Sequence, residues 1–267
     1  MPTTSTALRA SYVALALADS WVAGGRPHSA RRSRRVTKPL LMPTLSLSLL
    51  TDPRATTSPL RRSTLAAQGG GWAGDVALLG DGRRSFLTGV GAFAVGHLAS
   101  LSGLHAVRGP GALRSTSAAR TAAAVWVATA PLLTYAVARR DRVVAAPVLS
   151  YAALLALLAA RATHLDPALP RDARRCAAAG AWTFLLSDTL LATRSFVLDV
   201  SPPALDRAVM LTYTAAQLLL AEAAARSRAW TCGWGGAGVA PPHRFPRAST
   251  RVEEVVARHA GPWRTGR

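Results

Sequence analysis

The stretch VVAAPVLSYAALLALLAA, from Val143 to Ala160, contains no charged residue. A helix needs roughly 20 mostly apolar residues to cross the apolar core of a bilayer, and this stretch has about that length. It follows the charged segment RRDR at 139–142, and the run before that segment, from Thr121 to Ala138, is also uncharged. Because the charged segment is long enough only for a tight turn, the sequence predicts two neighbouring antiparallel membrane helices.

Further apolar runs continue this pattern along the chain, so we expect an all-α protein, a polytopic transmembrane helical bundle of about eight spans. The runs nearer the C-terminus are as long as the first two, and the last two each contain a single carboxylate: Phe86 to Val107, Cys176 to Thr193 and Ala208 to Ala225. The runs nearer the N-terminus are shorter, more polar or richer in glycine: Ala10 to Gly25, Thr37 to Thr51 and Ser63 to Gly80.

The run from Ala10 to Gly25 has an alternative interpretation as a signal peptide, because Arg9 precedes it and small residues lie near Ala23. Asp19 and Trp21 interrupt the apolar run, however, and no small-x-small cleavage site follows it. These features favour an uncleaved first span.

The charge pattern argues against a soluble protein. Charged residues make up 17% of the chain, and a soluble domain carries roughly 25%, spread along its length. Here the 32 Lys and Arg and 13 Asp and Glu are clustered between the uncharged runs. A nucleic-acid-binding domain would place such basic residues in one patch with interleaved aromatic residues, and no such domain is visible, so we expect no nucleic-acid partner. Loops facing anionic lipid head groups fit the pattern.

Two parts of the chain differ in kind. Residues 1–226 are predicted to form the transmembrane helical domain. The basic tail, 227–267, contains Gly, Pro, Trp and Arg without a sustained period, and we expect it to be disordered or bound to a surface. Eight spans place both termini on one side of the membrane, and the distribution of Lys and Arg favours the cytoplasmic side of a plasma membrane.

Two aspartates within the predicted spans are the first candidates for function. A central Asp costs about 2.5 to 3.5 kcal/mol in a bilayer, so such residues face the bundle interior and often mark a functional site. Asp188 lies deep in its run, within FLLSDTLL at 184–191. Asp75 follows GGGWAG at 69–74, whose glycines let another backbone come close. Each also has a purely structural interpretation: a hydrogen-bonded packing acid for Asp188, and an interfacial acid near a helix end for Asp75.

Two pairs of residues share a helix face with four-residue spacing. Tyr213 and Gln217 can present a hydroxyl and an amide to one cavity, and Phe93 and His97 stand in the same relation on another span. A lone histidine inside a membrane is more often a packing residue than a ligand. As a functional alternative, Tyr213, Gln217 and His97 are candidates for orienting a substrate or water.

Other polar residues carry less information. Asp19 and Glu222 lie near small residues toward the ends of their runs and are interpreted as interfacial or packing groups. Cys176 and Cys232 have neither metal-ligand nor redox spacing, and no HExxH motif is present. We accordingly expect no metal and no cofactor.

The order of several short motifs resembles a known family, the lysoplasmalogenase (YhhN-like) family of integral membrane proteins. The similarity covers roughly residues 37–225, and the motifs are spaced as in that family. They are TKPLLM at 37–42, Gly74-Asp75, GAFAVGHL at 91–98, FLLSDTLLA at 184–192 and MLTYTAAQL at 210–218.

This resemblance implies hydrolysis of the vinyl ether bond of lysoplasmalogens, with a lysophospholipid substrate and membrane lipids as partners. A vinyl ether is cleaved by protonation at carbon, and water then captures the oxocarbenium ion. The site needs a protonated carboxylic acid and a carboxylate, and two acids brought together can divide these states between them. We expect Asp75 and Asp188 to be that pair, and the substrate-binding or orienting residues to be Lys38, His97, Ser187, Tyr213 and Gln217.

Two other functions remain open at this point. Intramembrane carboxylates also form proton relays, so a proton-coupled small-molecule transporter is one alternative. Such transporters often show paired repeats with broken helices, and the chain shows neither. A non-catalytic lipid-binding membrane protein is the other alternative. A related ether, ester or amide lipid also remains possible as the substrate.

Overall fold

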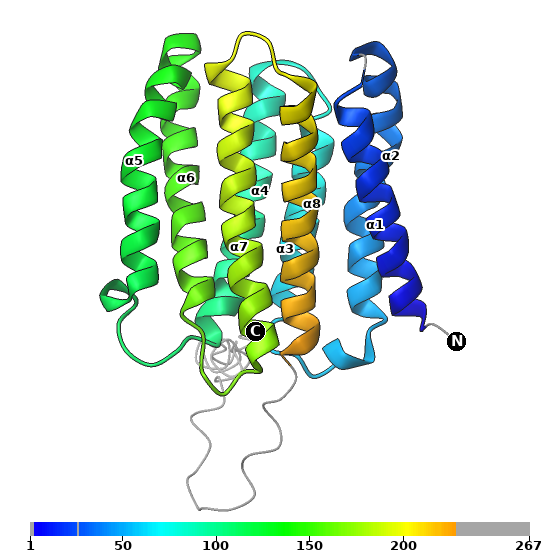
Figure 1. The fold of residues 1–267 in the computed structure, drawn as a ribbon, viewed down its shortest axis with the longest axis vertical. Helices are drawn as coiled ribbons and strands as arrows, with labels where there is room; N and C mark the ends of the chain where they lie inside the picture. The colour runs from blue at the N-terminus through cyan, green and yellow to red at the C-terminus, as the bar shows by residue number, and fades with distance from the viewer. Residues whose placement is uncertain (1–2, 26, 228–267) are drawn as a thin grey trace, which may run out of the picture. The chain divides into compact units, whose positions relative to one another are not determined.

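The computed structural model describes residues 3–25 and 27–227, and within these ranges the chain forms eight α-helices and no strand. The all-α prediction is confirmed. The helices run side by side, alternating up and down (Figure 1). They are α1 (Thr4–Ala23), α2 (Pro27–Leu50), α3 (Arg61–Ala77), α4 (Gly82–Ala106), α5 (Ser117–Arg140), α6 (Arg142–Thr163), α7 (Arg171–Ala192) and α8 (Pro203–Arg226).

The chain divides into two units, Met1–Thr231 and Cys232–Arg267. The second unit, and with it nearly all of the predicted tail, lies outside the described residues.

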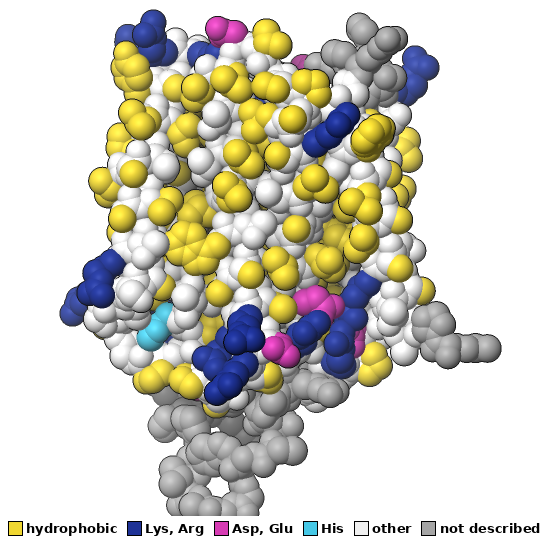
Figure 2. All heavy atoms as spheres, viewed as in Figure 1, with side chains coloured by type: hydrophobic (Ala, Val, Ile, Leu, Met, Phe, Trp, Pro, Cys, Tyr) yellow, Lys and Arg dark blue, Asp and Glu magenta, His cyan; other side chains and the backbone are white. Residues whose placement is uncertain are grey.

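Five of the described helices, α4 to α8, are long and apolar enough to cross a membrane, α7 together with the residues to Val197. They correspond to the five longest runs of the sequence. Large hydrophobic side chains such as Leu132 and Val95 are exposed on their outer faces. Figure 2 shows hydrophobic side chains over the middle of one face, and most Lys, Arg, Asp and Glu toward its ends. An apolar belt between charged ends is typical of an integral membrane protein.

The α5–α6 connection is a single residue, Asp141, as the hairpin prediction required. Its carboxylate accepts the backbone N–H of Val143 and so caps α6. Arg83 at the start of α4 and Arg140 at the end of α5 make ion pairs with Asp141 and Asp199, respectively. These contacts join the α3–α4, α5–α6 and α7–α8 connections at one end of the bundle, which we call the Asp141 end.

The opposite end, which we call the Asp52 end, is closed by an ion-pair network. Asp52 binds the guanidinium groups of Arg9 and Arg54, and Glu222 lies 2.8 Å from Arg9 Nε and 2.9 Å from Arg226 Nε. The network joins the start of α1, the α2–α3 connection and the end of α8, which lie together in Figure 1.

The prediction for the second span was wrong at its start. The apolar run begins at Thr37, but α2 begins at Pro27, because the basic stretch before Thr37 continues the helix beyond the apolar layer. Pro39 and Pro43 lie inside this helix. Pro43 has no N–H and leaves the Pro39 carbonyl without its helical donor. Trp72 Nε1 of α3 donates to that carbonyl at 3.1 Å, so a side chain replaces the missing bond.

Helices α3 and α4 touch through glycines. A Cβ added at Gly70 would lie 2.7 Å from Gly96 Cα, and one added at Gly74 would lie 2.5 Å from the Phe93 ring. Contacts this close exclude any side chain at those positions. The glycine-rich stretch therefore permits the close backbone approach that the sequence suggested.

Candidate functional site

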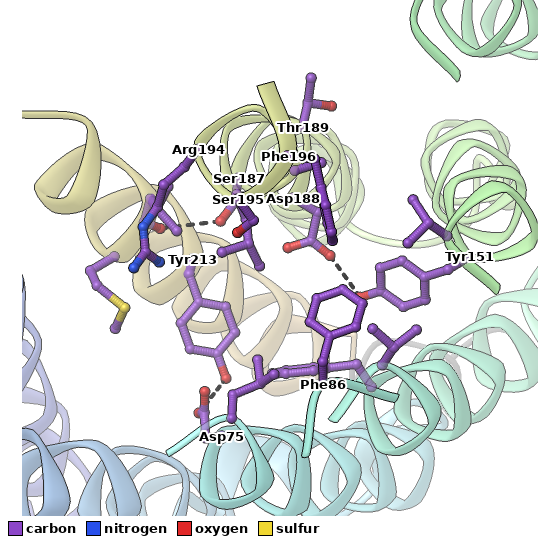
Figure 3. A pocket seen from close by; sticks show the side chains of 18 of the residues that line it. Asp75, Phe86, Tyr151, Ser187, Asp188, Thr189, Arg194, Ser195, Phe196 and Tyr213 are labelled. Atoms are coloured by element: carbon purple, nitrogen blue, oxygen red, sulfur yellow. Dashed lines mark hydrogen bonds between the residues drawn. The ribbon is translucent and has the colours of Figure 1, made fainter. Parts of the chain in front are cut away.

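One cavity, which we call the acid cavity, has a volume of about 370 Å³ and is lined by both predicted aspartates. It lies among helices α2 to α8 and extends toward the Asp141 end, where residues of the α3–α4 connection and of the π-helix at Thr193–Val197 line what we call its mouth. Figure 3 shows Asp75 and Tyr213 on one side and Asp188 and Tyr151 on the other.

Asp75 lies two residues before the end of α3, and its side chain is 1% exposed. Lys38 Nζ lies 3.1 Å from its Oδ1, and the Tyr213 hydroxyl donates to its Oδ2 at 2.6 Å. A buried charge is tolerated only when it is paired and hydrogen-bonded. The three side chains thus form a compact ion pair with a neutral donor, held by α2, α3 and α8.

Asp188 has a different set of neighbours. The Tyr151 hydroxyl of α6 donates to its Oδ2 at 2.6 Å and lies 3.1 Å from His97 Nε2 of α4. Within residues 3–25 and 27–227, no Lys, Arg or His forms an ion pair with Asp188. The carboxyl group therefore faces the acid cavity with a neutral hydroxyl as its partner.

Aromatic rings hold these side chains in place. Phe93 and Phe184 pack edge-to-face on Tyr213, with ring centroids 6.0 and 5.6 Å apart, and His97 packs on Phe184 at 4.5 Å. Such pairs restrict the rings to one orientation. The hydroxyl and imidazole groups are consequently placed before any substrate binds.

The predicted site residues divide into two groups. Lys38, Asp75, Ser187, Asp188 and Tyr213 line the acid cavity. The Ser187 hydroxyl donates to the Val209 carbonyl at 3.1 Å and so also joins α7 to α8.

His97 and Gln217 line a separate small cavity of about 10 Å³, roughly the space of one water molecule. Phe93 lines both this cavity and the acid cavity, and Phe184 lines the small one. His97 is linked to Asp188 through the Tyr151 hydroxyl, which lies 3.1 Å from His97 Nε2. Gln217 Nε2 occupies space that Gly71 leaves open, since a Cβ there would lie 3.2 Å away.

Sequence reasoning missed Tyr151 and Arg34 in this region, and it left Asp19 as either an interfacial or a packing group. Tyr151 interrupts the aliphatic run of α6, and that interruption was the available signal. Arg34 lines the acid cavity four residues before Lys38, a helical spacing hidden in a stretch that was expected to be a loop. Asp19 is fully buried, accepts the Thr37 hydroxyl at 2.6 Å and pairs with Arg34, so it is a packing group rather than an interfacial one.

No group of three or more His, Cys, Asp or Glu side chains in the described part of the chain is arranged to hold a metal ion. The polar groups of the acid cavity are three carboxyls (Asp75, Asp81 and Asp188), two phenols, an ammonium, guanidinium groups and Ser and Thr hydroxyls. This set can donate and accept protons and can bind an anion near the mouth.

Comparison with known proteins agrees with this architecture. The model of the YhhN family matches residues 33–224, which contain every residue of the acid cavity named above. No curated protein and no solved structure matches the chain. A match that covers most of the chain, together with a helical bundle around the motif aspartates, shows that the chain belongs to the YhhN family.

Proposed function

We propose that this protein is a membrane-embedded hydrolase that cleaves the vinyl ether bond of lysoplasmalogens, releasing a fatty aldehyde and a glycerophospho-base. The YhhN family is associated with lysoplasmalogenase activity. The observation that carries the proposal is the different partnering of two aspartates in one cavity: Asp75 beside an ammonium, and Asp188 beside a phenol.

The reaction requires one proton donor and one proton acceptor. A proton added to the β-carbon of the vinyl ether forms a C–H bond from the π electrons of the C=C bond, which becomes a single bond, and leaves an oxocarbenium ion. Water adds to that ion and gives up a proton, forming a hemiacetal, which collapses to the aldehyde and the glycerol hydroxyl. The net change is the addition of one water molecule, so the enzyme ends each cycle with the protons it had at the start.

The neighbours of the two aspartates suggest which one plays each role. The Lys38 ammonium stabilises a charged carboxylate at Asp75, 3.1 Å away. Asp75 is therefore assigned as the carboxylate that stabilises the cation and accepts the proton of water. Asp188, which has a neutral hydroxyl as its partner, is assigned as the acid that protonates the vinyl ether.

Tyr151 is assigned as a positioning residue for Asp188. Its hydroxyl lies between Asp188 Oδ2 and His97 Nε2, at 2.6 and 3.1 Å. While Asp188 is protonated, the hydroxyl can donate to His97, and after the proton leaves it can donate to the new carboxylate. The hydroxyl thus stabilises both states of the acid without changing its place.

We also propose a plasma-membrane location with both termini on the cytoplasmic side. The start of α1 and the end of α8 lie at the same end of the bundle (Figure 1). Lys and Arg are more frequent on the side of the termini when the C-terminal tail is counted with the loops, and this excess, which comes from the tail, supports the orientation.

The test compares purified protein with the variants Asp75→Asn and Asp188→Asn. Each is incubated with a choline lysoplasmalogen and with its ester-linked lysophospholipid counterpart, and the released aldehyde and fatty acid are measured. We expect aldehyde from the vinyl ether only, and a rate lower by about 10²- to 10⁴-fold in each variant, as for the loss of a general acid or base.

The matched control is Asp199→Asn, which removes an acid whose side chain is 97% exposed at the Asp141 end. It should retain the full rate. Full hydrolysis by Asp188→Asn, or fatty acid released from the ester, would overturn the proposal. Absence of any product would favour the transporter or lipid-binding alternative.

A further inference from the structure

Two guanidinium groups lie at the mouth of the acid cavity, and they differ in how they are bound. Arg194 of the π-helix has its Nε 2.5 Å from Asp206 Oδ1, an oxygen that also accepts the Ser201 hydroxyl. Figure 3 shows Arg194 at the edge of the cavity beside Ser187. Its charge is thus matched by a carboxylate of its own chain.

Arg34 of α2 is held less completely. Its Nη2 donates to the thioether sulfur of Met210 at 3.0 Å, and its Nε has no hydrogen-bond acceptor, although Asp19 Oδ2 lies 3.5 Å away. A thioether is a weak acceptor, and a guanidinium group offers five N–H donors. Because the Nε is buried beside Asp19, the donor capacity that the oxygens of an anion in the cavity would use lies in the Nη groups of Arg34.

The spacing of Arg34 and Lys38 relates this anion site to the candidate acids. Residues four apart on a helix lie on one face and roughly 6 Å apart along its axis. Lys38 contacts Asp75, and Arg34 lies one turn nearer the Asp141 end because α2 begins there. An anion at Arg34 would thus sit about one helical turn above the ion pair.

A lysophospholipid has matching dimensions. Five bonds separate the phosphorus atom from the ether oxygen on the other end of the glycerol, and an extended chain of five bonds spans roughly 6 Å, by comparison with 3.8 Å across three backbone bonds. The phosphate can contact Arg34 while the ether oxygen lies at the level of Asp75.

We infer that Arg34 binds the head-group phosphodiester of the lipid and is the residue by which the site discriminates against neutral alkenylglycerols, which lack that group. This inference rests on the proposed function for the reaction, but the binding site itself does not require turnover. Asp19, fixed by Thr37, positions the guanidinium group from the side away from the lipid.

The binding test uses ligands that the enzyme cannot hydrolyse. A 1-O-alkyl lysophosphocholine and the matching 1-O-alkylglycerol are titrated by calorimetry into detergent-solubilised wild-type protein, Arg34→Gln, Arg34→Lys and the control Arg35→Gln. Arg35 is an exposed arginine on the same helix that does not line the acid cavity. We expect Arg34→Gln to weaken binding of the 1-O-alkyl lysophosphocholine by about 10- to 100-fold and to leave the affinity for the 1-O-alkylglycerol unchanged.

Each further outcome decides the inference. Arg34→Lys keeps the charge but loses the two-pronged geometry, so an intermediate loss for the phospholipid alone supports the site even if Arg34→Gln does not fold. Equal losses for both lipids, or no loss for the phospholipid, would overturn it. Millimolar inorganic phosphate should not displace the lipid, and displacement would assign the site to the free anion instead.

A kinetic arm separates this inference from the proposed function. In Arg34→Gln, kcat/KM should fall for the choline lysoplasmalogen and stay constant for a 1-alkenylglycerol. If neither compound is cleaved by wild-type protein, the proposed function fails, and the calorimetric comparison still decides whether Arg34 binds the phosphodiester.

Discussion

The carboxylates at the Asp52 end and in the acid cavity differ in how many partners their own chain supplies. Asp52 accepts the backbone N–H of Arg54 at 2.8 Å and also binds the guanidinium groups of Arg54 and Arg9. In the described structure, Asp188 accepts one hydrogen bond, from Tyr151, and faces open volume. A carboxylate whose oxygens are occupied by hydrogen bonds and ion pairs within the chain holds helices together, whereas a carboxylate that faces a cavity is available to a substrate.

Asp75 combines features of both regions, and the largest expected effect concerns it. Asp75→Asn leaves the Lys38 ammonium buried without its counter-charge, which should destabilise the protein by about 3–5 kcal/mol. Thermal unfolding in detergent measures the effect. The double variant Lys38→Met, Asp75→Asn removes both charges and should recover much of the stability but none of the hydrolysis. Recovery of the activity would assign the carboxylate a structural role only.

Asp52→Asn should act on stability alone. It replaces an acid with three donor groups around it, and we expect a loss of about 2–3 kcal/mol with an unchanged rate per folded molecule. Denaturant unfolding together with aldehyde release tests both parts. If aldehyde release by Asp52→Asn fell as far as in Asp188→Asn, Asp52 would also be needed for activity, and the contrast between a structural and a catalytic carboxylate would be wrong.

The pH dependence of stability should reveal the Asp52 network. Burial raises the pKa of Asp52, but the hydrogen bonds from Arg54 and Arg9 and the charge of Arg9 outweigh it and hold this pKa at about 2, below the ordinary 3.8. A lowered pKa stabilises the folded state above about pH 4, and the contribution, about 2 kcal/mol, is lost as the pH falls toward 2. The difference in free energy of unfolding between wild type and Asp52→Asn should decrease as the pH falls over this range, and a constant difference would contradict the prediction.

The smallest effect is expected from Tyr151→Phe, which removes one hydroxyl beside Asp188. The kcat should fall about tenfold, or about 1.4 kcal/mol, while KM stays constant, because the hydroxyl positions the acid and does not bind the lipid. Tyr135→Phe is the matched control, since Tyr135 is 65% exposed on α5. A change in KM alone would place Tyr151 in the lipid-binding surface instead.

Hydropathy was sufficient to predict the helices and not sufficient to place their ends. The run Val143–Ala160 and its hairpin partner correspond to α6 and α5, because the cost of charge in a bilayer is a property of short stretches of sequence. The start of α2 was missed because a basic stretch reads as a loop whether or not its backbone is helical. The structure shows this stretch as the first turns of α2, a helix that packs on α1, α3 and α8.

The candidate acids could be predicted for the same energetic reason, but their surroundings could not. Asp75 and Asp188 stand out because an aspartate in an apolar run needs an explanation. Tyr151 interrupts an aliphatic run, but this signal is weaker, because a tyrosine in a membrane helix needs no such explanation. His97 was assigned to the same face of α4 as Phe93, but periodicity does not show that it packs on Phe184 and lines the small cavity instead of the acid cavity.

The glycine contact between α3 and α4 bears on how a lipid reaches the site. With the two backbones touching at Gly70 and Gly96, no acyl chain can slide between these helices at that depth. A substrate arriving sideways from the bilayer must pass between other helices, and one arriving from the membrane surface must pass the mouth at the Asp141 end. The same contact prevents α3 from shifting along α4, so Asp75 stays at one depth while lipids come and go.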